Sequence, residues 1–315
     1  RREDGQTAPA TSPAIWAVAA QIERENIEPC RIGVGQVPSA PGRRTIRIDG
    51  KNSTGTELAR RLTIMWLTPA QDRLFTGPAG ERRRFLDRFC LVHAPEHGKA
   101  SLRYEKSRSE RNRLLSEGSD DRLWFDALEA DMASCGAHIA QARAITVAAL
   151  KAEINARPLG AFPKAALILN GEAEALFESG AEFLEVEDFI KTNLRIDRAV
   201  DRRAGRTLRG VHKADLIASH IGKSMPASDC STGEQKALLI GLTLAHARAQ
   251  AERSPILLLD EIAAHLDSER RAALIEELLD LGTQVFMTGT DASLFEAFKG
   301  RAQSFHVEGG QVNLA

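Results

Sequence analysis

The sequence predicts an α/β protein with a buried parallel sheet, an antiparallel β subdomain and a projecting helical lobe. Residues 256–259 are all aliphatic and too few for a helix, which is typical of a strand buried on both faces of a parallel sheet. Between residues 15 and 49, short apolar or alternating stretches separated by Pro and Gly predict antiparallel strands. From residue 120 to 156, apolar residues recur every three or four positions, which predicts one long helix.

Composition limits the class of protein. The 315 residues are 43% hydrophobic and 27% charged, enough to bury a core and form more than one lobe. The formal net charge is −1, so any affinity for nucleic acid must come from local basic patches. The four cysteines show no zinc-site spacing, which indicates reduced thiols. No apolar run reaches membrane-spanning length and no signal peptide is visible, so we expect a cytoplasmic protein without a membrane partner.

The elements follow in order from the same patterns. Residues 1–14 are expected to form a loop, stretches 15–22, 31–37 and 45–49 are the expected antiparallel strands, and residues 57–62 predict a short helix. The later elements expected are a strand at 165–169, helices at 183–200 and 268–281, a strand at 284–288, and a closing hairpin at 305–314.

Two charged segments could contact nucleic acid. A helix is expected to begin near Pro78 and to carry Arg82, Arg83 and Arg84, for which a solvated helix face and DNA contact both stay open. The most basic part of the chain lies between Arg195 and Lys213, with seven Arg or Lys residues. Charged residues 101–116 and the long periodic segment 120–156 predict an antiparallel helix pair, the second helix about 50 Å long at 1.5 Å per residue.

One polar turn and one pair of carboxylates could form a phosphate site. Ser231, Thr232 and Gly233 open an apolar helix, whose unpaired N–H groups and positive dipole end favour an anion. Asp260 and Glu261 end the 256–259 strand, at the edge where open α/β sheets bind ligands. For the carboxylates alone, a plain core strand with a solvated end stays the alternative.

These residues resemble a known ATPase family. Ser-Thr-Gly-Glu-Gln-Lys-Ala-Leu at 231–238, Asp260-Glu261 and Leu266-Asp267 resemble the signature motif, Walker B motif and D-loop of an ABC-type ATPase head. The segment 77–88, with its Arg-Arg-Arg-Phe-Leu-Asp, is similar to a segment that follows the Q-loop region in the RecF family. Residues 204–216 resemble a RecF block ending Gly-Pro-His-Arg-x-Asp-Leu, with Val211 in place of Pro and Lys213 in place of Arg.

The resemblance implies a role for each matching residue. It implies that Asp260 holds Mg²⁺, that Glu261 is the catalytic carboxylate, and that the turn at residue 231 contacts the γ-phosphate of ATP across a homodimer. The nucleotide-binding candidates are Ser231, Thr232, Gly233, Glu234, Gln71 at the Q-loop position, Asp267 and Thr288. The DNA-binding candidates are Arg82, Arg83, Arg84, His212 and Lys213.

The implied function is that of a RecF-type protein of DNA replication and recombinational repair. It would bind double-stranded and single-stranded DNA, dimerise on ATP, hydrolyse ATP slowly, and support recombinase loading at gaps and the SOS response with RecO/RecR-type mediators. A transporter ATP-binding subunit is disfavoured by the long helical insertion and by the lack of a His after the 284–288 strand. A DNA-binding or dimerisation fragment without ATPase activity stays the alternative.

A phosphate-binding P-loop of the form Gly-x-x-x-x-Gly-Lys-Ser/Thr is not found in the sequence. The nearest match, at 220–224, has Ile217 where the first glycine is required. We therefore expect the Walker A segment to precede Arg1, and ATP and Mg²⁺ to bind only with that segment restored. The expected division is a β subdomain with the Q-loop region at 1–77, a helical lobe at 78–163, and the rest of the ATPase head at 164–315.

Overall fold

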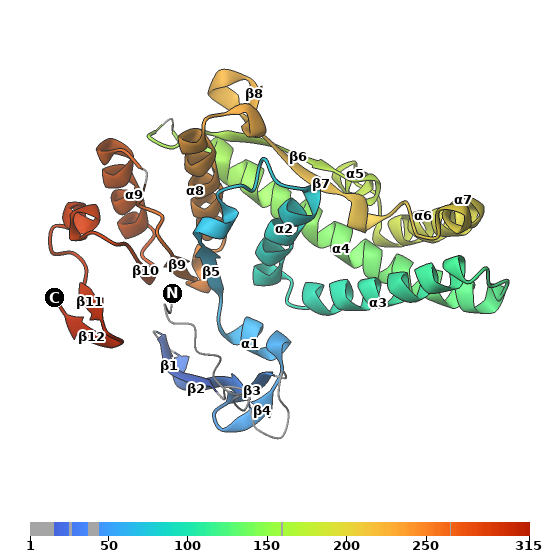
Figure 1. Cartoon of the computed structure of the whole chain (residues 1–315), viewed down its shortest axis with the longest axis horizontal. Helices are drawn as coiled ribbons and strands as arrows, with labels where there is room; N and C mark the ends of the chain where they lie inside the picture. Colours follow the sequence, from blue (N-terminus) through green and yellow to red (C-terminus); the bar gives the residue numbers. More distant parts are fainter. Residues whose placement is uncertain (1–15, 25–26, 37–43, 159, 265) are drawn as a thin grey trace, which may run out of the picture. The chain divides into compact units, whose positions relative to one another are not determined.

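The computed structural model describes residues 16–24, 27–36, 44–158, 160–264 and 266–315 (Figure 1). The chain forms two compact units, residues 1–62 and residues 63–315. The loop expected at 1–14 lies outside the described residues.

The first unit is a four-stranded antiparallel sheet followed by a short helix. The strands are β1 (Ala17–Arg24), β2 (Ile27–Gln36), β3 (Arg44–Ile48) and β4 (Lys51–Ser53), paired in that order, and the helix is α1 (Gly55–Arg61). The three predicted strands are confirmed, but β4 was missed because it is short and polar. Asp49 and Gly50 have φ values of 50° and 78°, which suits the tight turn that joins β3 to β4.

The second unit contains the predicted parallel sheet. Its order is β10 (Val285–Met287), β9 (Ile256–Leu259) and β5 (Ile64–Leu67). Leu257 and Leu259 are 0% and 4% exposed and belong to the main hydrophobic core, which includes α8 (Thr232–Ala249).

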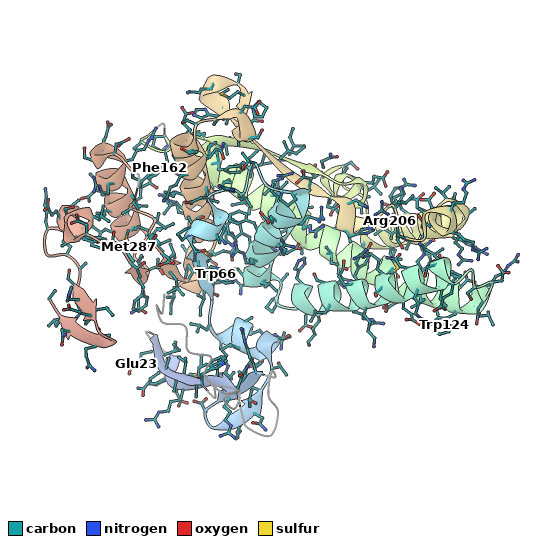
Figure 2. All side chains as sticks on the ribbon, viewed as in Figure 1. Glu23, Trp66, Trp124, Phe162, Arg206 and Met287 are labelled. Carbon is teal, nitrogen blue, oxygen red and sulfur yellow. The ribbon has the colours of Figure 1, made fainter. Side chains whose placement is uncertain are left out.

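The expectation that this strand is buried on both faces is wrong for the described part of the chain. On the face opposite the core, Leu258 pairs with Trp66 on one side and Phe286 on the other. These three side chains are 38%, 40% and 52% exposed (Trp66 is labelled in Figure 2). Within the described residues, one face of this sheet is therefore covered by the core and the other is partly exposed.

A second, antiparallel sheet lies in the same unit. Its strands are β6 (Ala165–Asn170), β7 (Asp215–His220) and β8 (Met225–Pro226). The P-loop-like residues 220–224 form the connection from β7 to β8, through a 3-10 turn at Ile221–Lys223, and no helix follows them there. The segment therefore leads through β8 toward α8, as expected, and a strand stands where a phosphate loop would be followed by an α-helix.

The helical lobe is built around α4 (Arg122–Ala156), a single helix of 35 residues. In Figure 1, α3 (His97–Ser116) runs beside it on one side and α6 (Phe183–Ile196) on the other. Met132 and Ile139 of α4 share a buried cluster with Ile190 and Leu194 of α6. The predicted pair is therefore confirmed, and α6 adds a third helix because it buries its apolar face on the same helix.

The remaining helices and the last hairpin complete the unit. They are α2 (Ala79–His93), α5 (Glu172–Glu178), α7 (Arg198–Ala204), α9 (Ser268–Asp280), β11 (Phe305–Glu308) and β12 (Gln311–Leu314). The helix predicted at 183–200 is divided at Asp197 into α6 and α7. The four cysteines are free thiols, as predicted. Within the described ranges, no helix is both long and apolar enough to cross a membrane.

Candidate functional site

Asp260, Glu261 and Thr288 come together where β9 and β10 end. The Thr288 hydroxyl donates to Asp260 Oδ1 at 2.6 Å, and the Glu261 N–H donates to Thr288 Oγ1 at 3.2 Å. Glu261 has φ 52°, in the left-handed region that non-glycine residues rarely adopt. All three residues are exposed. The parallel strands thus place two carboxylates and a hydroxyl at one open edge, as the sequence predicted.

Lys236 supports this edge from inside the protein. It lies on α8 and is only 6% exposed. Its Nζ donates to the Ala264 carbonyl oxygen at 2.9 Å, lies 3.4 Å from the Glu261 carbonyl oxygen, and lies 4.0 Å from Asp72 Oδ2. Sequence reasoning gave Lys236 no role, although a lysine at the start of an apolar helix was the available signal. The buried ammonium links the signature helix, the turn at Glu261 and the segment after Gln71.

Ser231 and Glu234 cap the N-terminus of α8 together. The Ser231 hydroxyl donates to Glu234 Oε2 at 2.9 Å, and the Ser231 N–H donates to the same oxygen at 3.0 Å. The Lys223 ammonium, followed by these hydrogen bonds from Ser231, lowers the pKa of Glu234 to about 2. Thr232 next to them is exposed. The Glu234 carboxylate is therefore ionised at neutral pH, and its hydrogen bonds with Ser231 fix the first turn of α8.

The packing of the described residues does not require a glycine at position 233. A Cβ added there would meet no heavy atom within 4 Å, and its φ is not in the left-handed region. A glycine normally costs about 1 kcal/mol in a helix relative to alanine. The packing of the described residues therefore gives no reason for a glycine at this position, and its role toward a nucleotide stays a prediction.

Gln71 and Asp267 occupy local caps away from the Asp260 hydrogen bonds. Gln71 Oε1 accepts from the Thr68 N–H at 2.8 Å and from the Thr68 hydroxyl at 3.0 Å. Asp267 Oδ1 accepts from the Arg270 N–H at 2.8 Å and caps α9. The structure gives both residues a capping contact, and their roles toward a nucleotide stay predictions.

Arg82 and Arg83 face the protein and bind to the start of β7. Arg82 forms two 2.8 Å hydrogen bonds to the Asp215 carboxylate, and Arg83 Nη1 donates to the Ala214 carbonyl oxygen at 2.7 Å. The Arg84 side chain is 75% exposed, with Glu81 3.9 Å away. The structure thus joins the segments 77–88 and 204–216, and only Arg84 of the three keeps its charge turned to solvent.

A buried arginine completes this junction. Arg143 of α4 donates to both Asp87 oxygens at 2.8 and 3.1 Å, to Glu174 Oε1 at 3.0 Å and to the Val211 carbonyl oxygen at 2.7 Å. Burial opposes ionisation of Asp87, but hydrogen bonds from His97 and Arg143 outweigh it and lower the pKa to about 2. One arginine therefore ties α2, α4, α5 and the loop before β7 together.

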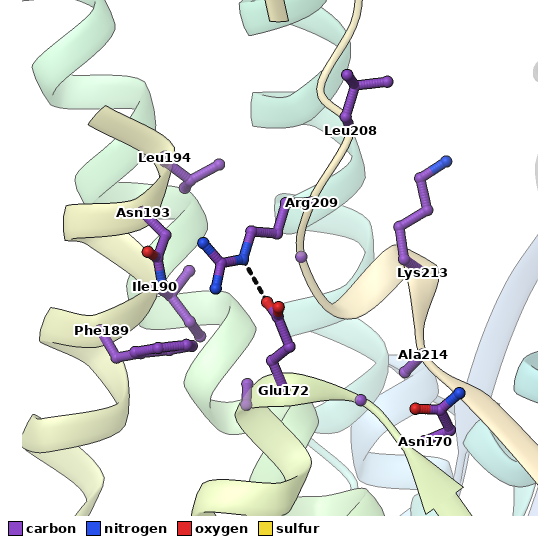
Figure 3. Close-up of a pocket in the computed structure, with 13 residues that line it drawn as sticks. Asn170, Glu172, Phe189, Ile190, Asn193, Leu194, Leu208, Arg209, Lys213 and Ala214 are labelled. Atoms are coloured by element: carbon purple, nitrogen blue, oxygen red, sulfur yellow. Dashed lines mark hydrogen bonds and ion pairs between the residues drawn. The ribbon is translucent and has the colours of Figure 1, made fainter. Parts of the chain in front are cut away.

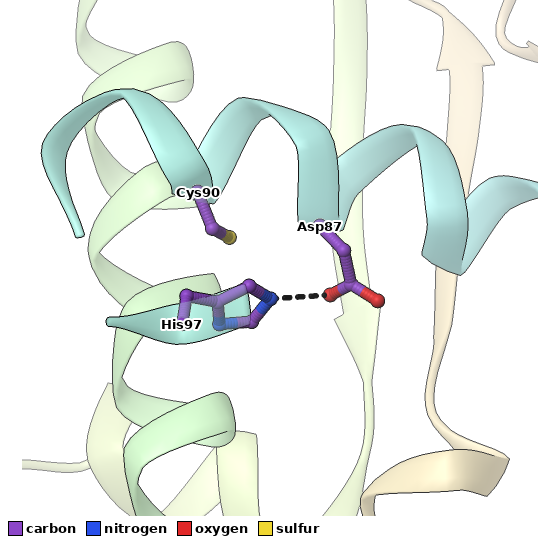
Figure 4. Close-up of side chains that lie close together, drawn as sticks. All are labelled: Asp87, Cys90 and His97. Atoms are coloured by element: carbon purple, nitrogen blue, oxygen red, sulfur yellow. Dashed lines mark hydrogen bonds and ion pairs between the residues drawn. The ribbon is translucent and has the colours of Figure 1, made fainter. Parts of the chain in front are cut away.

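Asp87, Cys90 and His97 also lie close enough to bind a metal ion, but their chemistry does not fit one (Figure 4). Asp87 already accepts from Arg143 and from His97 Nε2, the latter at 3.1 Å. Burial raises the pKa of the Cys90 thiol to about 12, so the thiol is protonated in the metal-free protein and its ionisation would oppose metal binding. A metal needs a deprotonated thiolate and a free carboxylate lone pair. The group belongs to the Arg143 junction.

His212 is held neutral inside the junction. Its Nε2 donates to the Thr207 carbonyl oxygen at 3.2 Å, which leaves Nδ1 to accept from the Tyr104 hydroxyl at 2.9 Å. Burial, followed by the charge of Arg108, lowers the pKa of His212 to about 4. Lys213, the next residue, is exposed. Of the predicted DNA-binding residues, Arg84 and Lys213 thus present a charge that could face a phosphate.

Known proteins share this sequence and fold. The chain is 50% identical to the DNA replication and repair protein RecF of Brucella suis over 307 residues. The matched region covers 96% of this chain and 80% of the relative. The chain belongs to the RecF family. It is also 47% identical to the RecF protein of Caulobacter vibrioides over 93% of this chain and 78% of that relative.

The fold comparison agrees with the RecF family. A solved structure described as the recombination mediator protein RecF-ATPrS in the RecFOR pathway matches with a TM-score of 0.78 at 21% identity, over 95% of this chain and 80% of that chain. Residues 97–289 match the family model described as "AAA domain, putative AbiEii toxin, Type IV TA system". The predicted family and the predicted α/β ATPase-head fold are therefore confirmed.

Proposed function

We propose that this protein binds DNA in an ATP-dependent way during replication and recombinational repair, and that its heads dimerise on ATP. The observation that carries the proposal is the edge formed by Asp260, Glu261 and Thr288, together with the open first turn of α8. Two carboxylates beside a hydroxyl suit a hydrated divalent cation, and free N–H groups at a helix start suit a phosphate. The relatives named as DNA repair proteins, and a relative described with ATPrS, support this assignment.

The oxygen ligands at this edge fit Mg²⁺. Asp260 would hold the ion, which when bound would neutralise negative charge on the phosphates. The Thr288 hydroxyl holds the Asp260 carboxylate in place at 2.6 Å. Glu261 would orient and polarise water, a positioned acid–base contribution of about 10²–10⁴ in rate. Lys236 fixes the backbone of the Glu261 turn, so the carboxylate starts from a defined position.

The same carboxylates predict weak ATP binding by these 315 residues alone. Two unit charges about 4 Å apart interact by roughly 4 kcal/mol at an effective dielectric of 20. Asp260 and Glu261 would therefore repel a triphosphate unless a P-loop supplied opposing N–H groups and a lysine. Nucleotide-dependent association is therefore tested in a RecF-family protein that carries a P-loop together with these residues.

The test of the proposed function is Gly233→Ala in such a protein. Because a Cβ meets nothing within 4 Å, we expect an unchanged or slightly higher melting temperature. We also expect much weaker ATP-dependent dimerisation, because the methyl group would block the close approach of a partner's phosphate. Static light scattering with ATP and Mg²⁺ measures the dimer. Gly118→Ala, at a left-handed glycine in the α3–α4 turn, is the control that alters stability without altering association.

DNA binding would use the exposed charges at the junction. We expect Arg84→Gln and Lys213→Gln each to weaken binding to DNA of any sequence and to lower the salt-dependence slope by roughly one unit. Arg103→Gln is the matched control, because Arg103 is exposed but paired with Asp131. Fluorescence anisotropy at several salt concentrations measures both quantities. If the salt-dependence slope is the same for all three variants, Arg84 and Lys213 do not contact DNA phosphates.

A further inference from the structure

Lys223, the lysine of the P-loop-like segment 220–224, reaches the first turn of α8. Its ammonium forms an ion pair with Oε1 of Glu234. The Lys223 N–H donates to His220 Nδ1 at 3.2 Å, and Ser224 follows in the left-handed region with φ 50°, so a defined 3-10 turn carries the lysine. The fold therefore brings this lysine to residues 231–234, the signature turn, where the proposed function places a phosphate.

The Glu234 carboxylate already takes the hydrogen-bond donors of the signature turn. Its Oε2 accepts from the Ser231 hydroxyl at 2.9 Å and from the Ser231 N–H at 3.0 Å, while Oε1 pairs with Lys223. A hydroxyl has a single proton to donate. Ser231 therefore cannot donate its hydroxyl proton to a phosphate while Glu234 accepts it.

The two charged side chains differ in their freedom to move. The Lys223 side chain is 50% exposed and that of Glu234 is 17% exposed. A lysine carries a compact charge on a flexible stem, and it binds phosphate as a point charge. Its ammonium can therefore leave the carboxylate for a nearby phosphate by side-chain rotation, without a change in the backbone of the 3-10 turn. The Glu234 carboxylate and a phosphate repel each other, so both cannot occupy the same donors.

We propose that Lys223 is a phosphate-binding residue of the signature turn, and that the Glu234 carboxylate occupies this turn until a phosphate replaces it. When the phosphate enters, Ser231 and Lys223 transfer their hydrogen bonds from the carboxylate to the phosphate oxygens, and the carboxylate turns to solvent. The proposal rests on the proposed phosphate binding at this turn and adds its regulation. It also changes the expected role of Glu234, from a nucleotide contact to an internal competitor.

Glu234→Gln removes the competing charge but keeps the helix cap. A glutamine oxygen still accepts from the Ser231 N–H, as in an ordinary capping box, so we expect an unchanged melting temperature. Tripolyphosphate is titrated into the 315-residue chain, and the amide resonances of residues 231–234 are followed by NMR. The variant should bind tripolyphosphate at this turn about threefold or more tightly than the wild type, because a like charge is removed.

Glu172→Gln is the matched control. Glu172 also lies in the first turn of a helix, α5, and also forms an ion pair, with Arg209 (Figure 3). This pair lies on the wall of a cavity of about 290 Å³ beside Lys213. The control removes the same charge from the chain at another place. If Glu172→Gln and Glu234→Gln tighten binding at residues 231–234 equally, only the net charge matters and the proposal is wrong.

Lys223→Met tests the lysine itself, in the wild type and in Glu234→Gln. If Lys223 served only to hold Glu234, the methionine would have no further effect once Glu234 is glutamine. A phosphate-binding lysine predicts instead that Lys223→Met weakens tripolyphosphate binding in both chains, by about threefold or more in Glu234→Gln, where no carboxylate competes for the ammonium. Lys223→Arg should retain binding. Loss of the methionine effect in Glu234→Gln would overturn the proposal.

ATP-dependent dimerisation tests the proposed function separately. In a RecF-family protein that carries a P-loop together with these residues, Glu234→Gln should lower the ATP concentration that gives half of the dimer in static light scattering, and Lys223→Met should raise it. A wild-type protein that does not dimerise on ATP would refute the proposed function. The roles of Lys223 and Glu234 would still be decided by the tripolyphosphate titration, which requires neither a P-loop nor a dimer.

Discussion

Arg143→Met should be among the most damaging substitutions in residues 63–315. The side chains of Arg143 and Glu174 are 5% and 1% exposed, and Arg143 also donates twice to Asp87. Methionine keeps much of the volume but removes the arginine from Glu174, from the Val211 carbonyl oxygen and from Asp87, which keeps only its hydrogen bond from His97. Removing one partner of a buried ion pair typically costs 3–5 kcal/mol, because the remaining charge stays buried. We expect a loss of about that size from the free energy of unfolding.

The effect should depend on pH in a defined direction. In the wild type, the depressed pKa of Asp87, about 2 against an ordinary 3.8, contributes stability above pH 3.8 that is lost as the pH falls toward 2. The shift corresponds to about 2 kcal/mol at 1.36 kcal/mol per unit. Burial, the first cause, already raises the pKa of Glu174. Without Arg143 the pKa values of Asp87 and Glu174 both rise. A carboxyl group whose pKa is higher in the folded than in the unfolded protein lowers the free energy of unfolding at high pH, and this cost disappears at low pH. The deficit of the variant should therefore be largest at pH 7 and shrink below about pH 4.

Urea unfolding followed by circular dichroism at pH 7 and at about pH 3 measures this deficit. Arg103→Met is the control, because the Arg103 side chain is 71% exposed and its pairing with Asp131 should matter far less. Adding Asp87→Asn and Glu174→Gln to Arg143→Met should recover part of the loss, because no buried charge is then left unpaired. If Arg143→Met costs no more than Arg103→Met, the argument from buried charge is wrong.

Two further predictions concern the loop before β7. Gly210→Ala should lower the melting temperature, because φ is 132° there and a Cβ would lie 2.5 Å from the Tyr104 hydroxyl oxygen; an unchanged melting temperature in circular dichroism would contradict this. Since the pKa of His212 is lowered from 6.5 to about 4, its contribution to stability should be present above pH 6.5 and be lost as the pH falls toward 4. Its ring resonances in an NMR titration should accordingly stay constant from pH 8 to pH 5, and a midpoint near 6.5 would show that the ring is solvated.

Local sequence patterns were sufficient to predict several helices and strands. The apolar run 256–259, the three-to-four periodicity of α4 and the glycine pair of the last hairpin each act within a few neighbouring residues, and each formed as expected. The carboxylates at the end of β9 followed from the same strand, because parallel strands fix where their carboxyl ends lie. Motif spacing then gave the family, which the comparisons confirmed.

Which charged side chains are paired inside the protein depends on how distant segments pack together. Arg82 and Arg84 look alike in the sequence, yet Arg82 binds Asp215, 133 residues away, while Arg84 remains exposed. Arg143 and Lys236 were overlooked for the same reason. An arginine or lysine has the same charge whether it is paired or free, and its partner is chosen by packing between distant segments. Local patterns carry no information about that choice, so the junction and the cavity beside Lys213 became visible only in the folded chain.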